Sequence, residues 1–169
     1  MQSRNFLAAA VLLLATASLA AQEAPSFLSN HHSSPEDKQA IERVLASYTS
    51  SLSSGDEKTF AALLLDEKIP FMATNSLEGS NTGDKPLDTR QFEDFRQAVF
   101  SSGKKYEQHF YNVRIAQDGK LAQASLDFVT KEANSQNGSY GWKVIQLLKV
   151  NDTWKIASEF YTAYPLPKQ

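Results

Sequence analysis

The first half of the chain carries its apolar residues at helical spacing. Ser34-Pro35 followed by two acids is typical of a helix start, since it offers a cap hydroxyl, a proline at the first helical position and carboxylates near the positive dipole end. Gly55 is a typical helix end. The apolar positions between them that share one helical face are Ile41, Val44, Leu45, Tyr48 and Leu52. The pattern predicts one long helix with a buried stripe.

Two shorter helices and an edge strand are predicted next. Asp56 can cap a helix whose buried side holds Phe60, Leu63 and Leu64. Residues 69–72 have the character of a short strand, and Pro70 places it at a sheet edge because proline cannot donate to a ladder. Asp88 and Gln91 resemble a capping box before a third helix that ends near Gly103. The inner face of that helix would hold Phe92, Phe95 and Val99.

The second half of the chain is a succession of strand-like runs. Residues 106–115, 121–131, 140–150 and 153–164 have strand length, and turn-forming residues separate them. Helices followed by a meander of strands predict an α+β fold, with three N-terminal helices packed on a curved antiparallel sheet.

Alternation along the last two runs predicts which side chains face the helices. One parity holds the larger apolar residues together with some polar ones, and we expect it to face inward: Tyr140, Trp142, Val144, Gln146, Leu148, Trp154, Ile156, Ser158 and Phe160. The other parity holds Ile145, Leu147 and Tyr161 among charged residues. Apolar residues on the predicted outer face indicate a back-to-back homodimer, with a mixed exposed face as the alternative.

Composition and the N-terminal sequence predict the cellular location of the protein. The chain has 169 residues, 41% hydrophobic and 21% charged, which is ordinary globular composition, and its net charge of −2 gives no basic surface for nucleic acid. Residues 1–20 resemble a signal peptide, with Arg4 before an apolar run and small residues that favour cleavage after Ala20. An uncleaved anchor is the alternative, but the run is short for a membrane span. We expect a secreted or periplasmic protein with no stable anchor after cleavage.

The remaining organisation follows from composition. Residues 21–33 are polar and are predicted to be a flexible linker, and residues 34–169 to be one domain. The chain contains no cysteine, which excludes disulfides, thiol catalysis and thiolate metal sites. His31 and His32 lack further ligands nearby, so we expect no metal and no cofactor.

The stretches 48–56 (YTSSLSSGD) and 150–156 (VNDTWKI) give the chain a resemblance to the nuclear-transport-factor-2-like, or SnoaL-like, superfamily. The resemblance covers residues 35–164 and implies a cystatin-like, cone-shaped α+β barrel. Within the superfamily the spacing is similar to that of ketosteroid isomerases. That likeness implies that Tyr48 and Gln146 would donate hydrogen bonds to a developing oxyanion, and it places Met72 where those enzymes carry their catalytic aspartate. A thioether cannot accept the proton, so ordinary steroid isomerisation is not expected.

The predicted inward residues define a candidate pocket for an apolar or aromatic molecule. Its wall would consist of Tyr48, Met72, Phe92, Phe95, Tyr111, Tyr140, Trp142, Gln146 and Ser158. A cone filled by these same side chains is the alternative. His109 shares a parity with Tyr111 and is the one candidate for a neutral-pH base.

Three functions remain open at this stage. The leading hypothesis is a secreted, non-catalytic binding domain for a small apolar compound. The second is an isomerase, lyase or hydrolase with His109 as base and Tyr48 and Gln146 as oxyanion donors. The third is an interaction module with a filled core that dimerises through Ile145, Leu147 and Tyr161.

Overall fold

The computed structural model describes residues 24–29, 31–74 and 91–167. The chain divides into two compact units, Met1–Asn30 and His31–Gln169. Within the first unit the described residues form a single 3-10 turn, Ser26–Ser29. The predicted signal peptide lies outside the described residues. No helix in the described ranges is long and apolar enough to cross a membrane.

In the second unit the first helix begins and ends at the predicted signals and the next begins at its predicted cap, whereas the third ends at Val99, before the predicted Gly103. Helix α1 spans Pro35–Ser54, with the Ser34 hydroxyl accepting a bond from the Asp37 amide and Gly55 in the left-handed conformation at φ 72°. Helix α2 spans Glu57–Ala62, and the Asp56 carboxylate caps it. Helix α3 spans Phe92–Val99 and begins at Gln91 without a side-chain cap. The predicted capping partner of Gln91, residue 88, lies outside the described residues.

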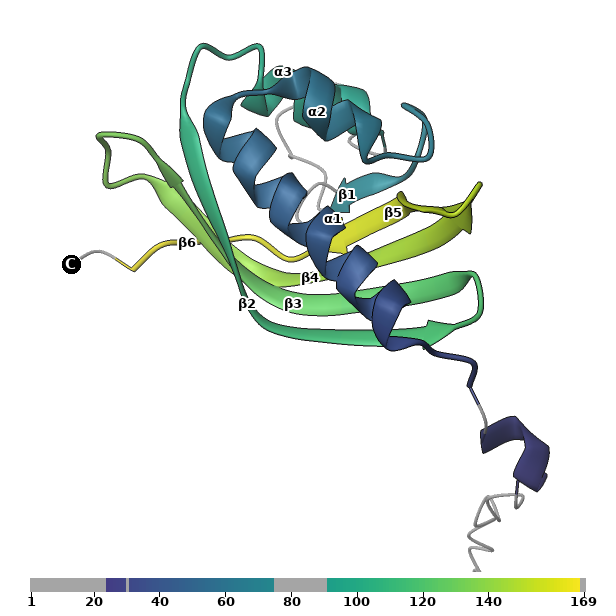
Figure 1. Cartoon of the computed structure of the whole chain (residues 1–169). Coiled ribbons are helices and arrows are strands. Elements are labelled where there is room, and N and C mark those ends of the chain that lie inside the picture. Colours follow the sequence, from purple (N-terminus) through teal and green to yellow (C-terminus); the bar gives the residue numbers. More distant parts are fainter. Residues whose placement is uncertain (1–23, 30, 75–90, 168–169) are drawn as a thin grey trace, which may run out of the picture. The chain divides into compact units, whose positions relative to one another are not determined.

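A curved sheet of six strands supports these helices (Figure 1). The strands are β1 Phe71–Ala73, β2 Tyr106–Asp118, β3 Leu121–Glu132, β4 Gly138–Val150, β5 Thr153–Tyr161 and β6 Tyr164–Pro165. Their order is β1-β5-β4-β3-β2, with β6 also paired to β4. All neighbours are antiparallel except β1, which pairs in parallel with β5 at the edge predicted from Pro70. The predicted α+β class is confirmed.

The predicted orientation of β4 is wrong. Ile145 and Leu147 are completely buried in the core against the helices, whereas Trp142 on the other parity is 53% exposed. The prediction placed Lys143 and Glu159, charged residues of a type that is almost never buried, on the outer face. Both are in fact buried, so the parity that carries them is the inner one.

A bulge in β5 explains why its orientation was only half right. Ile156 pairs with Leu147, but the next pair is Ser158 with Gln146, so Ala157 is an extra residue on β5. Before the bulge, Ile156 faces inward as predicted. After the bulge the parity reverses, and Glu159 turns inward while Phe160 is 40% exposed on the outer face.

Candidate functional site

Three side chains from three elements meet inside the domain. The ammonium nitrogen Nζ of Lys143 on β4 lies 2.6 Å from Oε1 of Glu159 on β5. The same ammonium donates a hydrogen bond of 2.8 Å to the hydroxyl of Tyr48 on α1, and that hydroxyl donates to Glu159 Oε1 at 3.1 Å. All three side chains are buried. They form a closed triangle that links the long helix to the centre of the sheet.

Aromatic rings enclose the ammonium group. The Lys143 nitrogen lies 4.6 to 5.5 Å from the ring centroids of Tyr48, Phe110, Phe128 and Tyr161. At these distances each ring face can attract a cation, and the attraction is larger where water is excluded. Sheet and helix thus supply both a carboxylate and a cage of rings to one lysine.

Burial controls the protonation behaviour of this group. Loss of solvent lowers the pKa of Lys143 and raises the pKa of Glu159, although their mutual attraction opposes both shifts. Burial, together with the negative charge of Glu159, also holds the pKa of Tyr48 well above its usual value. Burial therefore narrows the pKa gap between amine and carboxyl, which eases proton transfer within the pair.

A cavity of about 280 Å³ adjoins the triangle, and Lys143 forms part of its wall. Apolar walls come from α1, β1, α3 and β3: Leu52, Phe71, Phe95, Val99 and Phe128. Polar and charged side chains also line it: Asp94, Tyr106, Gln108, Thr130, Ser139 and Tyr161. A small, mainly apolar chamber with a few polar groups is typical of a ligand site.

One polar group in this wall has no partner. Gln108 is 5% exposed, and its amide nitrogen donates to the Thr130 hydroxyl at 2.5 Å. Its carbonyl oxygen Oε1 has no hydrogen-bond partner. A buried acceptor without a donor costs about 1–3 kcal/mol, so a bound molecule that donates to Gln108 would recover this energy.

The residues of the predicted pocket lie in different parts of the domain. Tyr48 points inward, but its hydroxyl is taken by the triangle. Phe95 lines the cavity, whereas Phe92 packs in the core and Met72 lies half-buried on the edge strand β1. The Gln146 carbonyl accepts a bond of 2.7 Å from the Ser158 hydroxyl.

Most of the remaining predicted residues lie away from the cavity wall. Tyr140, Trp142 and Tyr111 are exposed. Ile145 and Leu147, expected at a dimer interface, are core residues, and Tyr161 lines the cavity.

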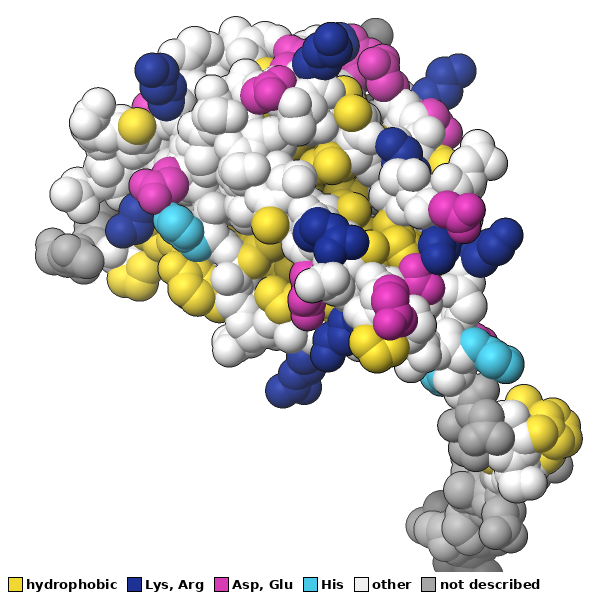
Figure 2. All heavy atoms as spheres, in the orientation of Figure 1, with side chains coloured by type: hydrophobic (Ala, Val, Ile, Leu, Met, Phe, Trp, Pro, Cys, Tyr) yellow, Lys and Arg dark blue, Asp and Glu magenta, His cyan; other side chains and the backbone are white. Residues whose placement is uncertain are grey.

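His109 is placed in a different groove. It lies with α1 and β2 residues around an open hollow of about 670 Å³, and its Nε2 is 2.7 Å from Glu107 Oε1. The imidazole is 56% exposed. Figure 2 shows hydrophobic side chains between charged ones along the line where α1 lies over β2. The histidine is therefore not among the groups that line the cavity beside Lys143.

Lys143 and Glu159 are the residues that sequence reasoning missed. The sequence did contain a signal for their burial, because the apolar residues Ile145, Leu147 and Tyr161 share their inward side. Weighing those neighbours above the two charges would have given the correct face. The bulge at Ala157, which turns Glu159 inward, left no sequence signal that we recognise.

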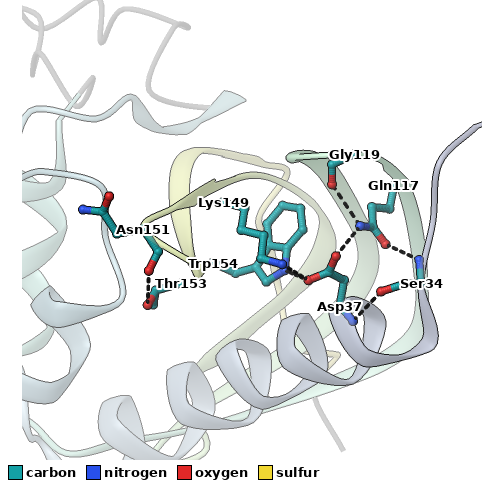
Figure 3. A network of polar contacts seen from close by, with 8 residues as sticks. All are labelled: Ser34, Asp37, Gln117, Gly119, Lys149, Asn151, Thr153 and Trp154. Atoms are coloured by element: carbon teal, nitrogen blue, oxygen red, sulfur yellow. Dashed lines mark hydrogen bonds and ion pairs between the residues drawn. The ribbon is translucent and has the colours of Figure 1, made fainter.

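A second polar network fastens the start of α1 to the sheet (Figure 3). The Asp37 carboxylate accepts bonds from Lys149 at 2.7 Å, the Trp154 indole at 3.0 Å and the Gln117 amide at 3.0 Å. Gln117 also accepts from the Ser34 amide. These bonds, Lys149 first, lower the pKa of Asp37 to about 2. Its bonds join the start of α1 to the sheet, so we assign the network a structural role. None of these residues lines the cavity.

Metal binding finds no support in the described ranges. No group of three or more histidine, aspartate or glutamate side chains converges there. His32 instead pairs with Asp118, with Nδ1 at 3.2 Å from Oδ1.

No family model matches the sequence, and no curated protein matches it. Solved structures do match the fold. A protein of unknown function with a cystatin-like fold from Nostoc punctiforme is 15% identical, with a TM-score of 0.59 over 78% of this chain and 94% of its own. An NTF2-like protein of unknown function from Methylobacillus flagellatus is 19% identical, with a TM-score of 0.58 over 80% and 98%. A proposed scytalone dehydratase from Novosphingobium aromaticivorans is 16% identical, with a TM-score of 0.58 over 79% and 90%. The predicted NTF2-like, cystatin-like fold is confirmed.

Proposed function

We propose that this chain is an exported binding protein for a small aromatic or apolar molecule, held in the cavity beside Lys143. The observation that carries the proposal is the unpaired Gln108 carbonyl in the wall of a mainly apolar chamber. An apolar body would fill the chamber, and a hydroxyl or N–H on it would donate to Gln108. The fold neighbours leave the activity open, because one fold serves many functions.

The cavity favours binding over the His109-based catalysis. That mechanism needs His109, Tyr48 and Gln146 around one substrate, but the histidine lines the open groove and Gln146 lies on the outer face with Ser158. Tyr48 alone is at the buried centre, where Lys143 and Glu159 occupy its hydroxyl.

A fluorescent alcohol tests the proposal directly. 2-Naphthalenemethanol has a flat apolar body and one hydroxyl donor, and its emission reports transfer from water to an apolar site. We expect saturable binding to the mature chain, weakened by Gln108→Leu and unchanged by Gln123→Leu, a matched change on the exposed side of β3. Absence of saturable binding to folded protein, or equal weakening by both substitutions, would refute the cavity as the site.

A second proposal concerns the outer sheet face, for which we propose pairing with a second copy of the chain. Its exposed aromatic side chains are Tyr140, Trp142, Phe160 and Tyr164, each 40–53% exposed. Large contiguous apolar patches are uncommon on monomeric proteins, and a single sheet face can pair with itself about a two-fold axis. This replaces the interface expected from Ile145 and Leu147, which are buried in each subunit.

Export rests on the sequence pattern of residues 1–20. Expression of the full chain in a bacterial host, followed by N-terminal sequencing of the periplasmic fraction, tests it. We expect a mature protein that begins at Ala21, and an uncleaved cytoplasmic product would contradict the proposal.

A further inference from the structure

We infer that the Lys143 amine forms a reversible imine with a small aromatic or apolar aldehyde or ketone that enters the cavity. The inference rests on the proposed function, because it uses the same chamber, and it names the chemical class of the ligand. Lys143 forms part of the cavity wall, an acid–base group lies 2.6 Å from its amine, and apolar side chains line much of the same cavity.

Because of its buried position, Lys143 has a larger fraction of neutral, nucleophilic amine than a surface lysine. Only the uncharged amine attacks a carbonyl carbon, and removal of water disfavours the ammonium. The lysine is 1% exposed, and a desolvated lysine in a hydrophobic pocket is a known route to amine activation. The surrounding aromatic rings stabilise the charged ammonium and so oppose this effect. The Glu159 carboxylate beside the amine can accept the proton.

Glu159 serves as the acceptor of that proton. The ammonium passes one proton to Oε1, which leaves a neutral amine and a neutral carboxylic acid. The amine nitrogen then bonds to the carbonyl carbon and gives a carbinolamine. Glu159 returns its proton to the hydroxyl group, the carbon–oxygen bond breaks, and one water leaves as the protonated imine forms. The products are an iminium beside a carboxylate, so charge and atoms balance without any oxidant or reductant.

The Tyr48 hydroxyl holds this geometry. It accepts from Lys143 and donates to Glu159, so it fixes the two groups relative to each other at either stage of the proton transfer. The iminium would stay among the same four rings that surround the ammonium, which stabilises its charge.

The rest of the chamber selects the carbonyl compound. Phe71, Phe95 and Val99 give apolar contact, and the unpaired oxygen of Gln108 would accept from a hydroxyl or N–H elsewhere on the ligand. A volume of about 280 Å³ limits the ligand to a small ring system.

Reductive trapping tests the inference. The mature chain is incubated with 2-naphthaldehyde and sodium cyanoborohydride at neutral pH, digested, and mapped by mass spectrometry. We expect Lys143 to carry the main naphthylmethyl adduct, in excess over any exposed lysine, because burial lowers its pKa and so raises its fraction of neutral amine. Adducts spread over exposed lysines, with none at Lys143, would overturn the inference.

Two variants keep the test independent of folding. Lys143→Met with Glu159→Leu removes the amine without leaving a buried charge, and it should lose the adduct while circular dichroism stays native. Lys120→Met removes an exposed lysine and should leave trapping at Lys143 unchanged. Persistence of the same total labelling in the double variant would refute the assignment.

Binding of 2-naphthalenemethanol distinguishes the proposed binding function from the proposed imine at Lys143. If 2-naphthalenemethanol binds and depends on Gln108 but the aldehyde gives no adduct at Lys143, the cavity function stands and the imine fails. If neither compound binds to folded protein, the proposed function itself fails.

Discussion

The ammonium of Lys143 lies 2.6 Å from Glu159 Oε1 at a point that solvent does not reach. Such a pair is poor evidence of stabilisation, because the energy of removing two charges from water offsets most of their attraction. Well-packed apolar residues would hold the same position at least as firmly. A buried pair beside a cavity therefore suggests a chemical role.

This reasoning gives a first prediction. Lys143→Met should destabilise the domain by about 3–5 kcal/mol, because it leaves the Glu159 carboxylate buried without its cationic partner and with only the bond from Tyr48. The double change with Glu159→Leu should recover most or all of that loss. Urea unfolding of the wild type, both single variants and the double variant measures the coupling. A double variant as unstable as the sum of the single ones would show that the two side chains are not coupled, which would contradict this prediction.

The sequence predicted most of the backbone of this domain because its signals are local. Ser34 and Gly55 fix the ends of α1 through bonds to residues a few positions away. The β3–β4 and β4–β5 turns likewise depend on short stretches of chain. Fold class followed from the order of these elements, and the resemblance to NTF2-like proteins gave the same answer.

The site could not be predicted in the same way, because its orientation depends on partners distant in sequence. Lys143 is buried because Glu159 and the Tyr48 hydroxyl lie beside it, and both come from other elements. Inward orientation of Glu159 further requires the extra residue Ala157 in β5. A parity count cannot anticipate a bulge, so the predicted pocket contained outward residues such as Trp142.

A second prediction concerns acid stability. The folded pKa of Asp37, about 2, lies below its usual value of 3.8, so folding favours the charged carboxylate. The contribution of this charge to folding stability is complete when the pH is above the usual pKa, and it disappears as the pH falls towards 2. Asp37→Asn should therefore lower the melting temperature at neutral pH and flatten its decline in acid. Thermal unfolding from pH 6 to 2 measures both, with the exposed Asp152→Asn as control. Parallel curves for wild type and Asp37→Asn would contradict the assignment.

A third prediction follows from a close backbone approach. A side chain added at Gly141 would meet the Thr162 carbonyl oxygen at once, where the chain leaves β5 and bonds to Trp142. Gly141→Ala should destabilise the domain by about 1–3 kcal/mol, since the backbone must move. Tyr140→Ala, at the neighbouring exposed position, should cost much less. Chemical denaturation compares them, and equal stabilities would show that Thr162 moves freely.

The last prediction separates the two faces of β4. Leu147 is fully buried, so Leu147→Asp should unfold the domain by placing an unpaired carboxylate in the core. Trp142 is 53% exposed on the outer face, so Trp142→Asp should leave the fold intact. If copies pair through that face, the charge should also convert a dimer into a monomer, because two carboxylates would oppose each other across the axis.

Sedimentation equilibrium and circular dichroism read out the two effects together. We expect a dimeric wild type, a folded monomer for Trp142→Asp and an unfolded chain for Leu147→Asp. Asp152→Asn, in the β4–β5 turn, should leave both the fold and the assembly unchanged. A wild type that stays monomeric at high concentration would remove the pairing proposal, whereas a folded Leu147→Asp would overturn the orientation of β4 itself. The face that carries Leu147 also carries Lys143, so this result bears directly on the proposed site.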